Sequence, residues 1–125
     1  MKTYITCPVS LSQKRLKLLP EIENVLQEVG YKTFVFKVGG SSKEIFARDL
    51  KQLESCDLIV AEVSEPSHGV GIELGLSYGL GLRRILLLEN DKKLTKLAEG
   101  MPKTTIISYK NVEDLKRKLR ATLEG

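Results

Sequence analysis

The sequence predicts a three-layer α/β fold, in which a five-stranded parallel sheet lies between two layers of helices. Short runs of β-branched, aromatic and aliphatic residues alternate along the whole chain with stretches of helical period. The run DLIVAEV at 57–63 is almost continuously apolar, as in a parallel strand that is covered on both faces. No repeat or biased linker interrupts this alternation, so residues 1–125 are predicted to form a single domain.

The first βα unit begins at the start of the chain. Residues 2–7 (KTYITC) are predicted to form a strand. Ser10 and Gln13 have the spacing of a capping box, which predicts a helix that Gly30 ends. Pro20 is expected to kink or restart this helix, because proline removes a backbone donor.

The second unit pairs a strand at 31–36, rich in β-branched and aromatic residues, with a helix that ends near Ser55. Ser41 and Glu44 predict a capping box at the start of that helix. The third strand is the apolar run at 57–63.

The remaining units repeat the alternation of strand and helix. We expect a helix from about Gly71 to Leu80, a strand at 83–89, a short helix at 91–99 and a strand at 103–109. Asn111 is expected to cap a basic, amphipathic C-terminal helix.

Right-handed crossovers leave few topologies for five such strands, and we predict the flavodoxin-like, Rossmann-like order 2-1-3-4-5. Ligands of such sheets bind beyond the carboxyl ends of the strands, near the point where the strand order reverses. The segments that follow the first and third strands, residues 7–12 and 62–75, are therefore the expected site.

Composition excludes several classes of function. Lys and Arg total 20 against 16 Asp and Glu, without a dense basic block, and the chain has no Trp, so nucleic-acid binding is not expected. Cys7 and Cys56 form no CxxC pair and cannot complete a zinc set with the single histidine, His68, whose role stays open. No apolar stretch is long enough to serve as a signal or a membrane span, so a cytoplasmic protein without membrane or metal partners is expected.

The segment EVSEPSHGVGIELG at 62–75 is the most informative stretch of the sequence. Gly69 and Gly71 precede or open a helix after a central strand, where backbone N–H groups and the Ser67 hydroxyl can hold an anion. The alternative is that the two glycines only permit a tight turn. Their spacing does not match a dinucleotide fingerprint, so NAD binding is not expected.

Two carboxylates, Glu73 and Asp49, are the candidate catalytic pair. Glu73 lies near the start of the predicted third helix, where a carboxylate can also serve simply to complement the helix dipole. Asp49 lies on the preceding helix and could instead pair with Arg48 or Lys51 in solvent. Two carboxylates that face one cleft are the minimum equipment for breaking a glycosidic bond.

The run ARDLKQLESCDLIVAEVSEPSHGVGIELG is similar to the core of the nucleoside 2-deoxyribosyltransferase superfamily, and most closely to the 2'-deoxynucleoside 5'-phosphate N-hydrolases. The resemblance extends over about residues 41–100. It implies that Glu73 is the nucleophile that takes the sugar C1' and that Asp49 is its partner, as an acid or in positioning sugar and water. Tyr4 matches a tyrosine that borders the sugar and the nucleophile. No cofactor or metal is implied.

The resemblance also implies a substrate-binding set. Ser67, Gly69 and Gly71 match a phosphate-holding turn, and Ile45 matches an apolar residue near the base. Thr95 falls where a hydroxyl from the neighbouring subunit completes the phosphate site, which implies a homodimer with shared active sites.

The first loop departs from the N-hydrolase pattern. Cys7-Pro-Val-Ser10-Leu-Ser12 stands in place of a Gly-Ser-Ile-Arg-Gly-Gly loop, so the phosphate-facing arginine is missing. Cys7 takes the place of glycine in a turn that resembles the Gly-Pro turn of the deoxyribosyltransferases. Ser10 and Ser12, helped by Lys14 or Arg15, are the candidates for binding phosphate in its absence.

The predicted function is hydrolysis of the N-glycosidic bond of a (deoxy)nucleoside 5'-monophosphate through a covalent glycosyl-Glu73 intermediate. Three alternatives stay open, namely a deoxyribosyltransferase that passes the sugar to a second base, a hydrolase of ribonucleotides such as cytidine monophosphate, and a non-catalytic nucleotide-binding module. The chain lacks the C-terminal extension in which the transferases resemble one another, which favours the hydrolase.

Overall fold

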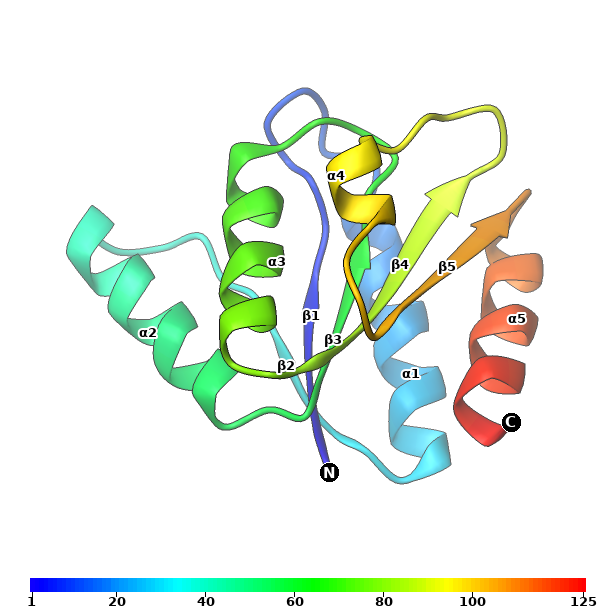
Figure 1. The fold of residues 1–125 in the computed structure, drawn as a ribbon, viewed down its shortest axis with the longest axis horizontal. Helices are drawn as coiled ribbons and strands as arrows, with labels where there is room; N and C mark the ends of the chain where they lie inside the picture. Colours follow the sequence, from blue (N-terminus) through cyan, green and yellow to red (C-terminus); the bar gives the residue numbers. More distant parts are fainter.

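The computed structural model describes residues 1–125 and has the predicted three-layer architecture (Figure 1). Five parallel strands form one sheet in the order β2-β1-β3-β4-β5, which confirms the predicted topology. Along the chain, the elements are β1 Lys2–Thr6, a 3-10 turn η1 Leu16–Leu18, α1 Leu19–Val29, β2 Lys32–Val35, α2 Ser42–Glu54, β3 Leu58–Glu62, α3 His68–Gly79, β4 Arg83–Glu89, α4 Lys96–Glu99, β5 Thr104–Tyr109 and α5 Val112–Glu124.

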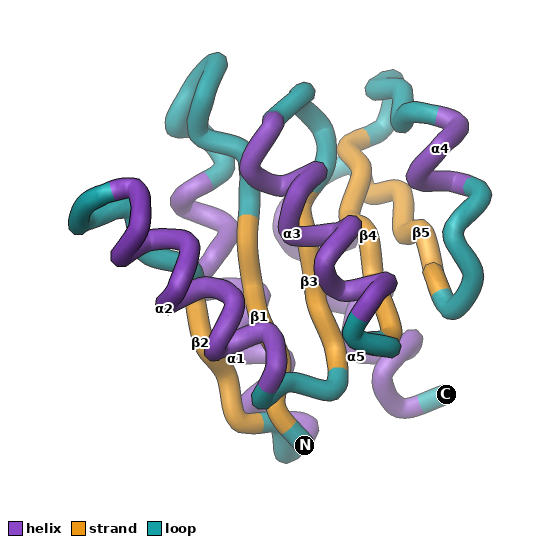
Figure 2. Tube along the Cα trace, turned by 60° about the vertical axis from the view of Figure 1, so that its left-hand side comes forward, coloured by secondary structure: helices purple, strands orange, loops and turns teal.

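Helices cover both faces of the sheet. α1 and α5 lie together on one face, and α2, α3 and α4 lie on the other (Figures 1 and 2). Because successive side chains of a strand point to opposite faces, Ile5 packs in the core under α1 and α5, while Tyr4 packs under α2 and α3. All of β3 is buried, as its continuous apolar run predicted. The alternation along β1 is what directs Tyr4 toward the helix that carries Glu73.

Several predicted boundaries are confirmed by local hydrogen bonds. The Ser41 hydroxyl accepts from Glu44 N at 3.2 Å, and the Glu44 carboxylate accepts from Ser41 N at 2.9 Å, which completes the predicted capping box of α2. Asn111 caps α5 by accepting from Asp114 N at 2.9 Å. Gly30 ends α1 with a φ of 105°, a conformation that favours glycine.

The predicted start of the first helix is wrong. Ser10 makes no capping hydrogen bond, and the chain from Cys7 to Arg15 is an irregular loop before η1. α1 begins only at Leu19, with Pro20 in its first turn, where a missing N–H costs no intrahelical hydrogen bond. The capping-box spacing at Ser10 therefore predicted a local structure that does not form, because contacts with distant parts of the chain outweigh it.

Two other helix starts differ from the prediction. α3 begins at His68, three residues before the expected Gly71, because the Ser67 hydroxyl accepts from Val70 N at 3.2 Å and caps it. The short helix expected at 91–99 is confined to α4, Lys96–Glu99. Asp91 has a φ of 72°, which no α-helix can contain, so the residues before Thr95 form a turn. None of the helices is long and apolar enough to cross a membrane.

Candidate active site

A cavity of about 440 Å³ opens at the carboxyl end of β1, beside the start of α3. Its walls come from the loop after β1, the loop after β2, α2 and α3, which meet at the end of the sheet where the predicted site lies (Figure 2). The predicted residues among its walls are Cys7, Ser10, Ile45, Asp49, Ser67, Gly69 and Glu73. The fold thus brings together most of the set that the sequence predicted.

Tyr4 and Glu73 meet at the inner end of this cavity. The Tyr4 hydroxyl, on β1, donates to Glu73 Oε2, on α3, in a short hydrogen bond. Tyr4 is fully buried, and its ring also packs against Phe34 with ring centroids 5.4 Å apart. Burial raises the pKa of Tyr4, and the Glu73 and Asp49 carboxylates raise it further. Tyr4 therefore stays neutral and remains a donor to Glu73 throughout the physiological range.

Glu73 is a carboxylate in an environment that disfavours its charge. Its residue is 8% exposed, and no Lys or Arg lies within ion-pair distance of it. Burial raises the pKa of Glu73 to about 7; hydrogen bonds from Tyr4 and Thr6 lower it, while the nearby Asp49 charge raises it. A carboxyl group that titrates near neutrality and whose charge is poorly compensated is suited to nucleophilic or acid–base chemistry.

Asp49 lies on α2, close enough to influence the pKa values of both Glu73 and Tyr4. Its side chain is 16% exposed, and its Oδ1 atom is buried without a hydrogen-bond partner. The Arg48 Nε lies 3.6 Å from that oxygen without forming a hydrogen bond, so the pairing with Arg48 that the sequence allowed is present but loose. Since Oδ1 is covered by protein, it is the remaining, exposed part of the Asp49 side chain that lines the cavity and can meet a substrate hydroxyl or a leaving group.

The N-terminal turn of α3 forms the opposite side of the cavity. Ser67 and Gly69 line it, and the free N–H groups at this helix terminus favour an anion. Gly71 lies on the other side of α3, so the structure does not bring it to the cavity. His68, in the first turn of α3, is exposed and does not line the Glu73 cavity.

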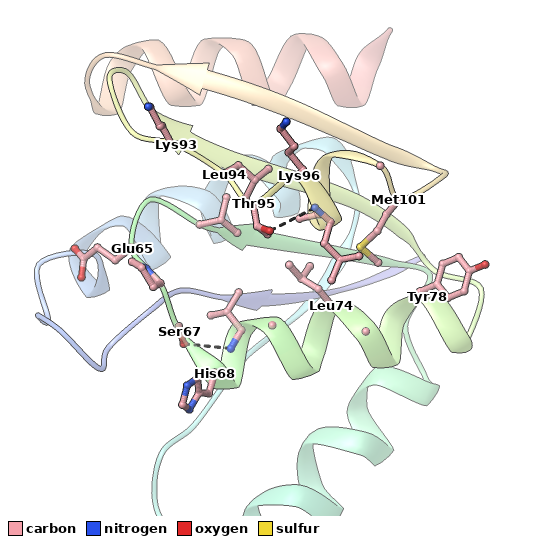
Figure 3. Close-up of a pocket in the computed structure, with 18 of the residues that line it drawn as sticks. Glu65, Ser67, His68, Leu74, Tyr78, Lys93, Leu94, Thr95, Lys96 and Met101 are labelled. Atoms are coloured by element: carbon pink, nitrogen blue, oxygen red, sulfur yellow. Dashed lines mark hydrogen bonds between the residues drawn. The ribbon is translucent and has the colours of Figure 1, made fainter.

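Thr95 is also separated from Glu73 within one chain. It lies with Gly71, Leu74 and Tyr78 in a second groove, about 820 Å³, between α3 and α4 (Figure 3). Its hydroxyl caps α4 by accepting from Leu97 N at 3.4 Å. Because α3 stands between this groove and the cavity, Thr95 does not serve the Glu73 of its own chain.

The loop after β1 supplies Cys7 and Ser10 to the cavity, while Ser12 and Arg15 turn away from it. Burial, together with the nearby carboxylates, raises the pKa of Cys7 to about 12, so its thiol stays protonated and is not a nucleophile. Arg15 is 3% exposed and bound to glutamates, so the expectation that it helps to hold phosphate is wrong.

Sequence reasoning missed some residues of the cavity. Thr6 lies two residues after Tyr4 on β1, and its hydroxyl reaches Glu73; the alternation of a strand predicts that both face α3. Lys37, after β2, is the one basic side chain in the walls of the cavity. Phe46 and Ile72 are 52% and 58% exposed and line the cavity from α2 and α3, as apolar surface that a nucleobase can contact.

Comparison with known proteins identifies the class of protein. Residues 3–118 match the nucleoside 2-deoxyribosyltransferase family, and the chain belongs to that family. A Thermofilum pendens protein described as a candidate 2'-deoxynucleoside 5'-phosphate N-hydrolase is 29% identical over 138 residues, which span 100% of this chain and 96% of the relative. A 5-hydroxymethyl-dUMP N-hydrolase of Danio rerio is 36% identical over 99 residues, which cover 74% of this chain and 68% of the relative.

Solved structures show the same fold. The CMP N-glycosidase of Clostridium botulinum superposes with a TM-score of 0.81 at 22% identity, covering 98% of this chain and 99% of that chain. A 2-deoxyribosyltransferase of Bacillus psychrosaccharolyticus superposes with a TM-score of 0.71 at 22% identity, covering 98% and 96%. The resemblance seen in the sequence is confirmed, and by family and by its relatives the protein is an enzyme of the N-glycosidase class.

Proposed function

We propose that the protein hydrolyses the N-glycosidic bond of (deoxy)nucleoside 5'-monophosphates and releases free base and (deoxy)ribose 5-phosphate. The observation that carries this proposal is the pair of carboxylates, Glu73 and Asp49, that meet at one cavity with Tyr4 bound to the first of them. The relatives support the substrate class, because they are named for a 2'-deoxynucleoside 5'-phosphate and for 5-hydroxymethyl-dUMP.

In the first step, an oxygen of ionised Glu73 attacks the sugar C1' while the C1'–N bond breaks through an oxocarbenium-like transition state. The bonding electrons leave with the base, whose nitrogen takes a proton from Asp49 or from solvent. Tyr4 holds Glu73 Oε2 by its hydrogen bond and so fixes the orientation of the carboxylate.

In the second step, water attacks C1' of the glycosyl ester and the bond from C1' to the Glu73 oxygen breaks. Asp49 accepts the proton of the attacking water, and Glu73 leaves as a carboxylate. Burial makes Glu73 a poorer leaving group than a carboxylate in water, because it raises the pKa of Glu73 to about 7. The hydrogen bonds from Tyr4 and Thr6 compensate in part, since both lower that pKa.

The 5'-phosphate is proposed to lie against Ser67, Gly69 and Ser10, where the N-terminus of α3 faces the loop after β1. The base is proposed to contact Ile45, with the exposed Phe46 beside it on α2. Lys37 is the one cation in the cavity walls, which lack the arginine of the related first loops, and it is the candidate to pair with the phosphate.

A homodimer that shares its active sites is also part of this proposal. Thr95 lies in the α3–α4 groove and not with Glu73, so a phosphate contact from Thr95 requires a neighbouring subunit. Apolar side chains make up part of the lining of the groove, and Leu97, one of them, is 83% exposed. Leu97→Glu is expected to give a monomer in light scattering and to release base more slowly. Leu16→Glu, outside the groove, should change neither the oligomeric state nor the turnover.

The test of the function is chromatography of deoxy- and ribonucleoside 5'-monophosphates and their nucleosides after incubation with the protein. Base release from the monophosphates supports the nucleotide N-hydrolase. Exchange of bases between nucleosides in the presence of a second free base would favour the transferase. Binding without any turnover would favour a nucleotide-binding module.

A further inference from the structure

A second group of carboxylates surrounds Arg15 at the same end of the sheet and takes no part in the proposed chemistry. Arg15 Nη2 lies 3.2 Å from Glu89 Oε1, its Nε lies 3.0 Å from Glu65 Oε2, and its Nη1 lies 3.8 Å from Glu62 Oε2. The Tyr109 hydroxyl, which donates to Glu62, completes this group. One guanidinium from the loop after β1 is thus bound to the ends of β3 and β4 and to the loop after β3.

Glu65 is the member of this group that joins two loops. It follows β3, and its two carboxylate oxygens accept one bifurcated hydrogen bond from the Ser12 hydroxyl, at 3.1 and 3.0 Å, in addition to the bond from Arg15 Nε. Partial burial raises the pKa of Glu65, but the bonds from Arg15 and Ser12 lower it more, so the net shift is downward. Glu65 is therefore ionised at neutral pH, and both contacts are charge-assisted.

The two joined loops form facing walls of the active-site cavity. The loop after β1 supplies Cys7 and Ser10, and the loop after β3 leads directly into Ser67 and Gly69. The carboxylate of Glu65 points away from the α3–α4 groove (Figure 3). Its bonds to Ser12 and Arg15 therefore tie the loop after β3 to the loop after β1.

We propose that Glu65, with Ser12 and Arg15, is a positioning clamp that sets the width of the phosphate end of the cavity. This inference rests on the proposed function, since it is the 5'-phosphate that would lie between Ser10 and the start of α3. Arg15 also compensates part of the charge of the three glutamates around it, which would otherwise repel a phosphate more strongly. None of the three clamp residues lines the cavity that holds Glu73. Their effect is therefore on substrate binding and not on the chemical step.

Glu65→Gln tests the clamp, because the amide keeps the shape of the side chain but loses the charge and one acceptor. We expect KM for a nucleoside 5'-monophosphate to rise about tenfold, which corresponds to the loss of one charge-assisted hydrogen bond. We expect kcat to change less than about twofold. The inhibition constant of ribose 5-phosphate should rise in parallel, while the dissociation constant of the unphosphorylated nucleoside stays unchanged.

Glu89→Gln is the matched control. It makes the same chemical change at another carboxylate bound to Arg15, but the Glu89 carboxylate, on β4, makes no bond to Ser12 or to the loop after β3. The one bond from Glu89 to that loop is made by its backbone N to the Ser64 hydroxyl, at 2.8 Å, and the substitution leaves it in place. A KM for the monophosphate that stays at the wild-type value in Glu65→Gln would overturn the clamp. So would an equal loss of affinity for nucleoside and monophosphate, because that result describes general damage to the fold.

Calorimetric binding separates this inference from the proposed function. If the wild-type protein binds nucleoside 5'-monophosphates without releasing base, the hydrolase is wrong, and weaker monophosphate binding by Glu65→Gln still supports the clamp. Ser12→Ala provides a second variant, since it removes the bifurcated hydrogen bond to Glu65 and leaves Arg15 in place. Monophosphate binding that is unaffected in both variants contradicts the clamp in either case.

Discussion

Two groups of carboxylates lie at the same end of the sheet, and they differ in what surrounds them. In the cavity, Glu73 has the Tyr4 hydroxyl and a second carboxylate, Asp49, as neighbours, and its pKa is raised to about 7 by burial. Around Arg15, hydrogen bonds from the guanidinium lower the pKa of Glu89, and bonds from Arg15 and Ser12 lower that of Glu65. Glu62 beside Arg15 is as buried as Glu73, whereas Glu65 and Glu89 are partly exposed, and all three have the cation that Glu73 lacks.

The difference separates a reactive arrangement from a structural one. A carboxylate without a cation retains part of its basicity, because no partner satisfies its charge, and it can form a bond to an electrophilic carbon. A carboxylate bound to a guanidinium gives up that basicity in exchange for a fixed position. On the proposed function, the chemistry lies in the Glu73 group, whereas the Arg15 group holds two loops together.

The largest expected effect is the loss of Glu73. Glu73→Ala should reduce base release by roughly 10⁴-fold or more, because α3 has no other carboxylate to form the bond to C1'. Chromatography measures the free base, and mass spectrometry of the intact protein should detect a glycosyl adduct in the wild type alone. Glu54→Ala, an exposed change on α2, is the control. Near-normal turnover in Glu73→Ala would rule out the nucleophile assignment.

Asp49→Asn should slow turnover by roughly a hundredfold or more, because the amide neither gives nor takes the proton. The substitution preserves shape, so the affinity for substrate should change much less than kcat. Asp91→Asn is a matched control in an exposed turn, where Asn tolerates the positive φ of that position. A kcat equal to that of the wild type would show that Asp49 only fills space beside Glu73.

Removing the cation from the second group should act on stability instead of chemistry. Arg15→Met leaves Glu62 buried without its counter-ion, which should lower the free energy of unfolding by about 3 to 5 kcal/mol. Arg120→Met breaks a surface pair with Glu28 and should cost less than about 1 kcal/mol. Denaturant unfolding of both variants measures the difference. Equal losses in the two would mean that burial of the Arg15 group carries no extra energy.

The smallest expected effect is the dependence of stability on pH. The folded-state pKa of Glu73 is raised from 4.5 to about 7, so the folded protein binds a proton more tightly than the unfolded chain. That contribution is complete below pH 4.5 and is lost as pH rises through about 7. Glu73→Gln does not titrate, so its stability relative to the wild type should increase by about 3 kcal/mol between pH 4.5 and pH 8. Thermal unfolding at several pH values tests this, and parallel curves for both proteins would contradict it.

Much of the fold was predictable because local sequence determines it. The apolar run of β3 specifies a strand covered on both faces, and the Ser41–Glu44 capping box specifies where α2 begins. The first loop was not predictable in this way. Ser10 and Gln13 have capping spacing, yet Ser12 and Arg15 bind Glu65, at sequence separations of 53 and 50. These long-range bonds outweigh a local cap that is worth about 1 kcal/mol.

By itself, the sequence determined the order of the strands and helices, and its motif identified Glu73 and Asp49 as the pair to examine. Only the tertiary structure decided that Tyr4 binds Glu73, that Gly71 and Thr95 face another groove, and that Arg15 serves glutamates and not phosphate. The physical reason is that strand and helix signals are local in the chain, whereas the charge state of a carboxylate depends on burial and on partners that folding brings from distant positions.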